Sequence, residues 1–119
     1  MNTQKTFTGG CQCGAVRYEA KMDPKTATAC NCSMCGKCGS LLTFIPEADF
    51  TLLSGQDSLT NYQFNKKHIN HLFCKVCGIK SFANGAAADG SMMIAVNLRC
   101  IDDFDIKTLE IQEFDGKSL

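Results

Sequence analysis

The stretch from residue 30 to residue 38 constrains this chain more than any other, because it holds four cysteines in nine residues: Cys30, Cys32, Cys35 and Cys38. Thiols this dense do not serve core packing, so they indicate disulfides, redox chemistry or a metal ion. Two pairs flank the stretch, Cys11 with Cys13 and Cys74 with Cys77, and Cys100 brings the total to nine. An odd count without a secretion signal argues against a disulfide framework and favours metal binding.

Composition places the chain among small globular domains. We expect one zinc-binding domain over residues 1–119, with a modest core at 45% hydrophobic residues and a flexible segment at 1–6. Lys+Arg and Asp+Glu number 12 each, which gives no electrostatic case for nucleic acid or an anionic membrane as partner.

No apolar run approaches the ~20 residues of a membrane span. The N-terminus does not resemble a signal peptide, so we expect a reducing, cytoplasmic location. The oligomeric state is left open.

The apolar pattern predicts a mainly β fold of short antiparallel strands. Strands are expected at 15–20, 26–29, 41–45, 50–53, 59–64, 69–73, 81–83, 92–96 and 109–114, with a polar hairpin turn at 65–67. The run at 92–96 is continuously apolar, which predicts a fully buried strand with Met92 and Met93 in the core. No window of helical length shows a 3.6-residue period, so no helix is expected.

The two flanking pairs have the form of zinc-binding loops. In Cys74-Lys75-Val76-Cys77-Gly78 two thiolates two residues apart can share one ion, and Gly78 lets the backbone turn with a positive φ. Cys11-Gln12-Cys13-Gly14 is a tighter version of the same loop. The two pairs together would make a closed four-thiolate site, although either pair could instead join the central cluster.

If the flanking pairs do join, the central cluster must bind its own ion. Cys30, Cys32 and Cys35 then supply three ligands, and three protein ligands with one exchangeable position is the layout of a catalytic zinc. Three thiolates leave the ion a poor Lewis acid, so the site suits the binding of a substrate thiolate better than the ionisation of water. Nothing in the spacing favours an iron–sulfur cluster over single zinc ions.

These motifs resemble the glutathione-dependent formaldehyde-activating enzymes and the related centromere-protein-V-like proteins. The resemblance covers about residues 7–105 and is carried by Gly10-Cys11-Gln12-Cys13-Gly14 with Val16 and Tyr18, Cys30-Asn31-Cys32-Ser33-Met34-Cys35, His71-Leu72-Phe73-Cys74-Lys75-Val76-Cys77-Gly78 and Asn97-Leu98-Arg99-Cys100. It implies a small β-tent fold stapled by two zinc ions. The closed zinc would be held by Cys11, Cys13, Cys74 and Cys77, and the open one by Cys30, Cys32 and Cys35.

The resemblance also implies an activity, that of a carbon–sulfur lyase. Glutathione would bind at the open zinc as thiolate and add to formaldehyde, giving S-hydroxymethylglutathione, or a related small-molecule thiol adduct would be made or broken there. Three residues depart from the family pattern: Asn31 stands where His is common, Gly36 stands where Arg is common, and Cys38 is extra. As a fourth thiolate, Cys38 would close the central site. The alternative is therefore a non-catalytic, zinc-stabilised β domain that binds a protein partner.

Three other features have ordinary interpretations. His71 alternates with Phe73 on its strand, so a partly buried histidine is favoured over a ligand or base. The cationic run at 66–68 could receive glutathione carboxylates, but a solvated turn is favoured. Cys100 lies just past the apolar run, which predicts a buried, inert thiol.

Overall fold

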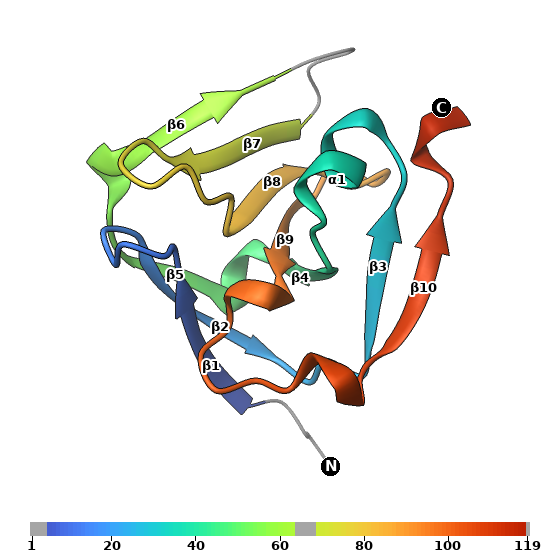
Figure 1. The fold of residues 1–119 in the computed structure, drawn as a ribbon, viewed down its shortest axis with the longest axis horizontal. Coiled ribbons are helices and arrows are strands. Elements are labelled where there is room, and N and C mark those ends of the chain that lie inside the picture. Colours follow the sequence, from blue (N-terminus) through green and yellow to red (C-terminus); the bar gives the residue numbers. More distant parts are fainter. Residues whose placement is uncertain (1–4, 64–68, 119) are drawn as a thin grey trace.

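The computed structural model describes residues 5–63 and 69–118 and contains two sheets (Figure 1). The smaller sheet has three antiparallel strands in the order β1-β2-β5: β1 (Lys5–Gly10), β2 (Arg17–Met22) and β5 (Phe50–Ser54). In β2 the side chains of Tyr18, Ala20 and Met22 are buried while the intervening ones are not. This alternation of period two is what places one face of the small sheet against the core.

The larger sheet has seven strands in the order β10-β3-β4-β9-β8-β7-β6. They are β3 (Thr26–Cys30), β4 (Leu42–Pro46), β6 (Leu59–Tyr62), β7 (Ile69–Cys74), β8 (Phe82–Ala86), β9 (Met92–Asn97) and β10 (Glu110–Phe114). Neighbours pair antiparallel, except that β10 runs parallel to β3. The predicted mainly β class is confirmed, with this one parallel pair in place of a wholly antiparallel arrangement.

A helix that the sequence analysis did not expect follows β3. This helix, α1 (Ser33–Cys38), begins after Cys32, whose sulfur accepts the N–H of Cys35, and ends at Gly39 with φ +69°. Single 3₁₀ turns at Glu47–Asp49, Gln56–Ser58, Leu98–Cys100, Ile106–Thr108 and Gly116–Ser118 complete the connections. Six residues are too few for a 3.6-residue period to be visible, so α1 depends on its cap and its tertiary contacts.

Two other expectations need correction. Lys5 and Thr6 belong to strand β1, paired with Met22 and Lys21, rather than to a flexible N-terminal segment. Strand β9 is not fully buried, because Met92 is exposed and Met93 is half-exposed on the face away from Ile94. The predicted turn at 65–67, and residue 64 of the strand expected at 59–64, lie outside the described residues. No helix among the described residues is long and apolar enough to cross a membrane.

Aromatic side chains join the two sheets. The ring of Tyr18 from β2 lies 5.0 Å from that of Phe50 and 5.7 Å from that of Phe82 on β8, centroid to centroid. The Tyr18 hydroxyl donates a 3.1 Å hydrogen bond to the carbonyl of Ser81, so the polar end of this fully buried residue has a partner. The core cluster built on these rings also includes Cys11 and Cys74, which places one cysteine group against the hydrophobic core.

Candidate functional site

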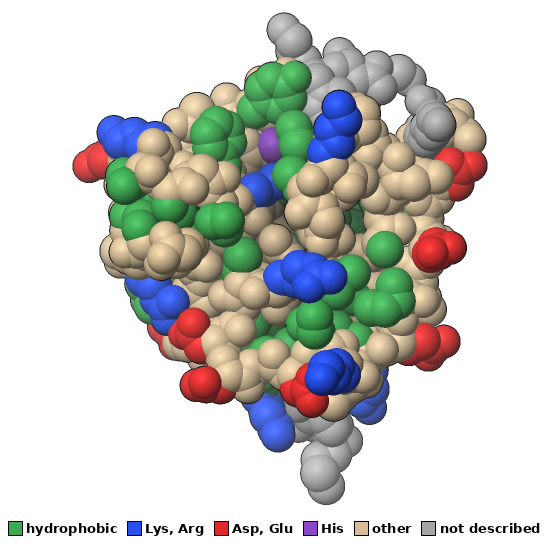
Figure 2. Space-filling view, viewed as in Figure 1, with side chains coloured by type: hydrophobic (Ala, Val, Ile, Leu, Met, Phe, Trp, Pro, Cys, Tyr) green, Lys and Arg blue, Asp and Glu red, His purple; other side chains and the backbone are tan. Residues whose placement is uncertain are grey.

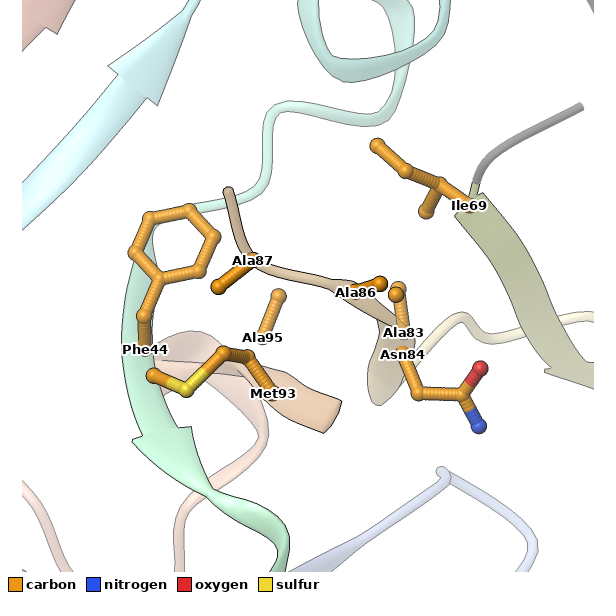
Figure 3. Close-up of a pocket in the computed structure, with 9 residues that line it drawn as sticks. Phe44, Ile69, Ala83, Asn84, Ala86, Ala87, Met93 and Ala95 are labelled. Carbon is orange, nitrogen blue, oxygen red and sulfur yellow. The ribbon is translucent and has the colours of Figure 1, made fainter. Parts of the chain in front are cut away.

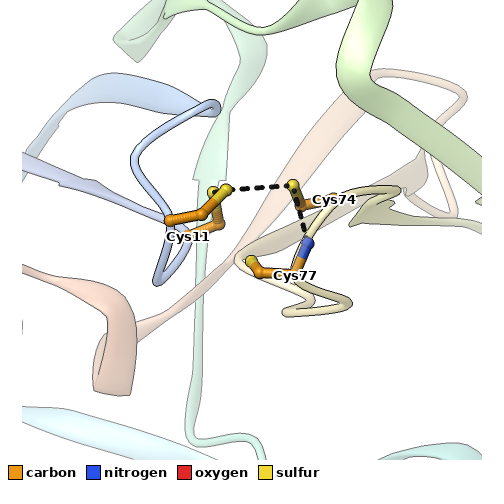
Figure 4. Close-up of side chains that lie close together, drawn as sticks. Cys11, Cys74 and Cys77 are labelled. Atoms are coloured by element: carbon orange, nitrogen blue, oxygen red, sulfur yellow. Dashed lines mark hydrogen bonds between the residues drawn. The ribbon is translucent and has the colours of Figure 1, made fainter.

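Four cysteines from two distant segments meet in one cluster, which we call the clamp: Cys11, Cys13, Cys74 and Cys77. Their sulfur atoms all lie within 4.8 Å of one another. Figure 4 shows Cys11, from the loop between β1 and β2, facing Cys74, the last residue of β7, and Cys77 in the loop that follows. From the sequence alone, either flanking pair could have joined the central cluster. In the structure the two flanking pairs lie together instead.

The clamp geometry fits a tetrahedral metal ion. The sulfur of Cys13 lies 3.6 Å from that of Cys11 and 3.7 Å from that of Cys74. A tetrahedral site with metal–sulfur bonds of about 2.3 Å would separate its sulfurs by about 3.8 Å, whereas a disulfide needs about 2.05 Å. All nine cysteines are free thiols in the structure. The clamp could therefore hold one metal ion.

Backbone N–H groups point at the clamp sulfurs. The sulfur of Cys74 accepts the N–H groups of Val76 at 3.4 Å and Cys77 at 3.5 Å, and Cys11 accepts that of Val16 at 3.3 Å. Gly78 has φ +81°, as predicted, and its N–H bonds the Cys74 carbonyl at 2.7 Å. Hydrogen bonds from the backbone N–H groups of Ile79 and Cys13 lower the pKa of Cys77 to about 6. This loop thus favours the thiolate form of Cys77, whereas the pKa of Cys13 is raised to about 11.

A second cluster contains Cys30, Cys32 and Cys35, whose sulfurs also lie within 4.8 Å of one another. Cys30 ends β3, and the next two cysteines frame the first turn of α1. The sulfur of Cys30 accepts the N–H of Cys32 at 3.5 Å, and that of Cys32 accepts the N–H of Cys35 at 3.3 Å. These hydrogen bonds match those of the loop around Cys74, so the central cluster could hold a second metal ion.

Cys38 does not join the central cluster. It ends α1 one turn beyond Cys35, is exposed, and donates a 3.6 Å hydrogen bond to the sulfur of Met34. In the part of the chain that the structure describes, the central group is therefore three thiols, and a metal ion held by them would keep one coordination position for another ligand.

Comparison with known proteins identifies the family. The family model of the glutathione-dependent formaldehyde-activating enzymes matches residues 6–114. The chain belongs to this family. The fold is shared by the crystal structure of a Rhodobacter sphaeroides protein solved as a structural-genomics target, which is 27% identical. That match has a TM-score of 0.79 and covers 90% of this chain and 99% of the other. The resemblance inferred from the cysteine motifs is thus confirmed.

In this member of the formaldehyde-activating family, one cation, Lys80, acts electrostatically on a central thiol and on a buried histidine. Burial raises the pKa of Cys35 to about 12, and the positive charge of Lys80 opposes that shift. Burial also lowers the pKa of His71 to about 4, with Lys80 adding to the effect, so the imidazole is neutral at pH 7. His71 is only 5% exposed. Figure 2 shows the histidine recessed among hydrophobic side chains beside a Lys or Arg side chain.

The C-terminal segment lies against the central cluster. The carbonyl of Phe114 accepts the N–H of Asn31 at 3.1 Å, and the Asn31 amide donates to Asp115 at 2.9 Å. A Cβ placed on Gly116 would lie 2.5 Å from the sulfur of Cys30. Asn31, which departs from the family's usual histidine, therefore fastens a segment that lies largely beyond the matched residues 6–114.

Replacing Gly116 by Ala should weaken metal binding at the central cluster at least tenfold and leave the clamp unchanged. The added methyl group would press on Cys30, whose sulfur cannot rotate away while it holds a metal. Titration against a competing chelator checks this. Gly36→Ala is the matched control, because its added Cβ would approach no described atom beyond its chain neighbours and its own helix backbone closer than 3.6 Å. Equal affinities in the two variants would show that Gly116 is not needed at the site.

Buried Asn97 connects the surroundings of the two clusters. Its side-chain oxygen accepts the N–H groups of Leu41 at 3.4 Å and Arg99 at 3.2 Å, and its amide donates to the carbonyl of Lys80 at 3.1 Å. Arg99 in turn donates to the Gly39 carbonyl at the end of α1 at 3.0 Å. These contacts fix the position of α1 relative to the segment that follows Cys77.

Sequence reasoning missed Lys80, Asp115 and Gly116. Only their places in the chain could have pointed to them. Lys80 comes three residues after Cys77, and Asp115 and Gly116 lie in the last five residues. Cys100 lies outside both clusters and is half-buried rather than buried as predicted, and burial raises its pKa to about 11. Its inertness stays a prediction.

Proposed function

We propose that this chain is a zinc-dependent enzyme of carbon–sulfur lyase type that forms or breaks S-hydroxymethylglutathione. Two zinc ions would be bound, a structural one by Cys11, Cys13, Cys74 and Cys77 and a reactive one by Cys30, Cys32 and Cys35. Membership of the formaldehyde-activating family supports the reaction class. The observation that carries the proposal is the convergence of three thiols while Cys38 is turned toward Met34.

The donor set favours zinc as the metal. Closely spaced cysteine thiolates in four-ligand and three-ligand groups are typical of structural and catalytic zinc sites, respectively. When bound at the central cluster, zinc would hold the glutathione sulfur as a thiolate at neutral pH. Such a site needs reduced thiols, which is consistent with the cytoplasmic location that we propose.

The chain's own groups would position the reactants. Three thiolates carry more negative charge than one zinc ion neutralises, and the half-buried cation Lys80 offsets part of it. The same cation suits the carboxylates of glutathione. His71 is uncharged at pH 7 because its pKa is about 4, so its imidazole can donate one hydrogen bond and accept another rather than supply a proton.

A direct assay tests the proposal. The two-zinc protein should bind glutathione and speed the exchange between glutathione, formaldehyde and S-hydroxymethylglutathione, followed by NMR exchange at equilibrium. Uncatalysed addition of thiols to formaldehyde is already easy, so the rate must be compared with that of free glutathione at equal concentration. Two-zinc protein that neither binds glutathione nor exceeds the free-thiol rate would refute the proposed reaction.

A further inference from the structure

The outer face of the larger sheet carries an apolar pocket of about 330 Å³. Phe44 from β4 and Ile69 from β7 stand on opposite sides, and Met93, Ala95 and Ala83 lie between them (Figure 3). Phe44 is 54% exposed and Ile69 48% exposed, so large apolar side chains surround a space open to solvent. Exposure of this kind, gathered around a concave site, is typical of a ligand-binding surface.

The strand register connects this pocket to the surroundings of the central cluster. Phe44 pairs with Ala95, Ala95 with Ala83, and Ala83 with His71, so these four side chains form one row across β4, β9, β8 and β7 on a single face. His71 ends the row. On the same face, Leu42 lies two residues before Phe44 and pairs with Thr28 of β3, two residues before Cys30 at the end of that strand. The pocket and the thiol of Cys30 therefore lie on one face of the larger sheet.

The lining specifies the chemistry of an occupant. Among the described residues it holds no charged side chain, and the one polar side chain found there, Asn84, already accepts a 2.7 Å hydrogen bond from Asn70. A dry cavity of about 150 Å³ accommodates benzene, so this pocket has room for a group of about twice that size. Formaldehyde has no carbon substituent to place there, and the charged ends of glutathione do not suit an apolar lining.

We propose that this pocket receives the aliphatic or aromatic substituent of a larger aldehyde whose glutathione adduct is the substrate of the central site. The inference rests on the proposed function and names its substrate class. In the reaction the glutathione sulfur forms a bond to the aldehyde carbon, the carbonyl electron pair moves to oxygen, and oxygen takes up the proton lost by the thiol. The product is a hemithioacetal, and the reverse reaction returns both components without any oxidant.

Binding of two stable thioether probes, S-hexylglutathione and S-methylglutathione, to the two-zinc protein tests the inference by calorimetry. The hexyl probe should bind at least tenfold more tightly. Ala95→Leu, which fills the pocket, should remove that preference, and Phe44→Ser, which removes a solvent-exposed wall, should reduce it about threefold. Ala88→Leu is the matched control, because Ala88 is exposed and outside the lining, and it should keep the preference. Zinc content and circular dichroism confirm that each variant folds.

The possible outcomes separate this inference from the proposed function. Equal affinity for the two probes, with formaldehyde-adduct exchange intact, would overturn the pocket assignment alone. Failure of both probes and of glutathione to bind would overturn the proposed function and this inference with it. If Ala95→Leu alters only the sedimentation of the protein, the pocket contacts a second copy of the chain and the substrate assignment is wrong. Faster turnover of hexanal than of formaldehyde, lost in Ala95→Leu, would support it.

Discussion

Replacing Cys74 by Ser should unfold the domain at room temperature rather than merely empty one metal site. Cys74 is fully buried and belongs to the hydrophobic core cluster as well as to the clamp. A structural zinc contributes roughly 10–16 kcal/mol of binding free energy in small zinc domains, which is as large as the whole stability of about 5–15 kcal/mol of a typical domain. A strong chelator should have the same effect on the unchanged protein. Urea unfolding followed by circular dichroism measures both.

Cys100→Ser is the control for this prediction. Cys100 is a half-buried thiol outside both clusters, so its replacement should cost about 1 kcal/mol and preserve cooperative unfolding. If Cys74→Ser unfolds at the same urea concentration as Cys100→Ser, the clamp does not stabilise the fold and the structural role assigned to it is wrong.

Replacing Cys35 by Ser should lower the rate of S-hydroxymethylglutathione exchange at least 100-fold while leaving the domain folded. Changes around a metal site commonly cost 10–100-fold even at residues that only orient a ligand, and Cys35 is proposed as a ligand itself. The hydrophobic core cluster is built around Tyr18 and its neighbours and does not include Cys35, so the fold should survive. Zinc content should fall from two ions to one.

Cys38→Ser supplies the matched control on the same short helix. Its sulfur bonds Met34 instead of joining the cluster, so this variant should keep both zinc ions and the full exchange rate. A Cys35→Ser protein that retains two zinc ions and normal exchange would exclude the central cluster as the site of the reaction.

Local patterns were sufficient to predict most strands and to indicate metal binding by the cysteine pairs, whereas the grouping of the two flanking pairs in one site came only from the family resemblance. The alternation around Tyr18 correctly indicated a strand with one buried face, observed as β2, and the spacing at Cys74 indicated a metal-binding loop. These signals work because period-two burial and ligand spacing are properties of a few consecutive residues. The single domain over residues 1–119 and the ligand role of each cysteine remain predictions.

Features that depend on distant segments could not be predicted. The run at 92–96 appeared fully buried because all five residues are apolar, yet the side chains of Met93 and Ala95 face a pocket. Whether an apolar strand is covered on one face or two depends on which elements pack there, and that is not encoded in its own residues. The approach of Gly116 to Cys30 arises in the same way, from the pairing of β10 with β3.

The central claim, that one of two metal sites has only three protein thiolates, is tested most directly by zinc X-ray absorption spectroscopy. The protein without glutathione should show about 3.5 sulfur neighbours per zinc, because four at the clamp and three at the central site are averaged. Addition of glutathione should raise this value to about 4. A value of about 4 without glutathione, falling to about 3.5 in Cys38→Ser, would contradict the account and indicate a closed, structural site of the kind expected in a protein-binding domain.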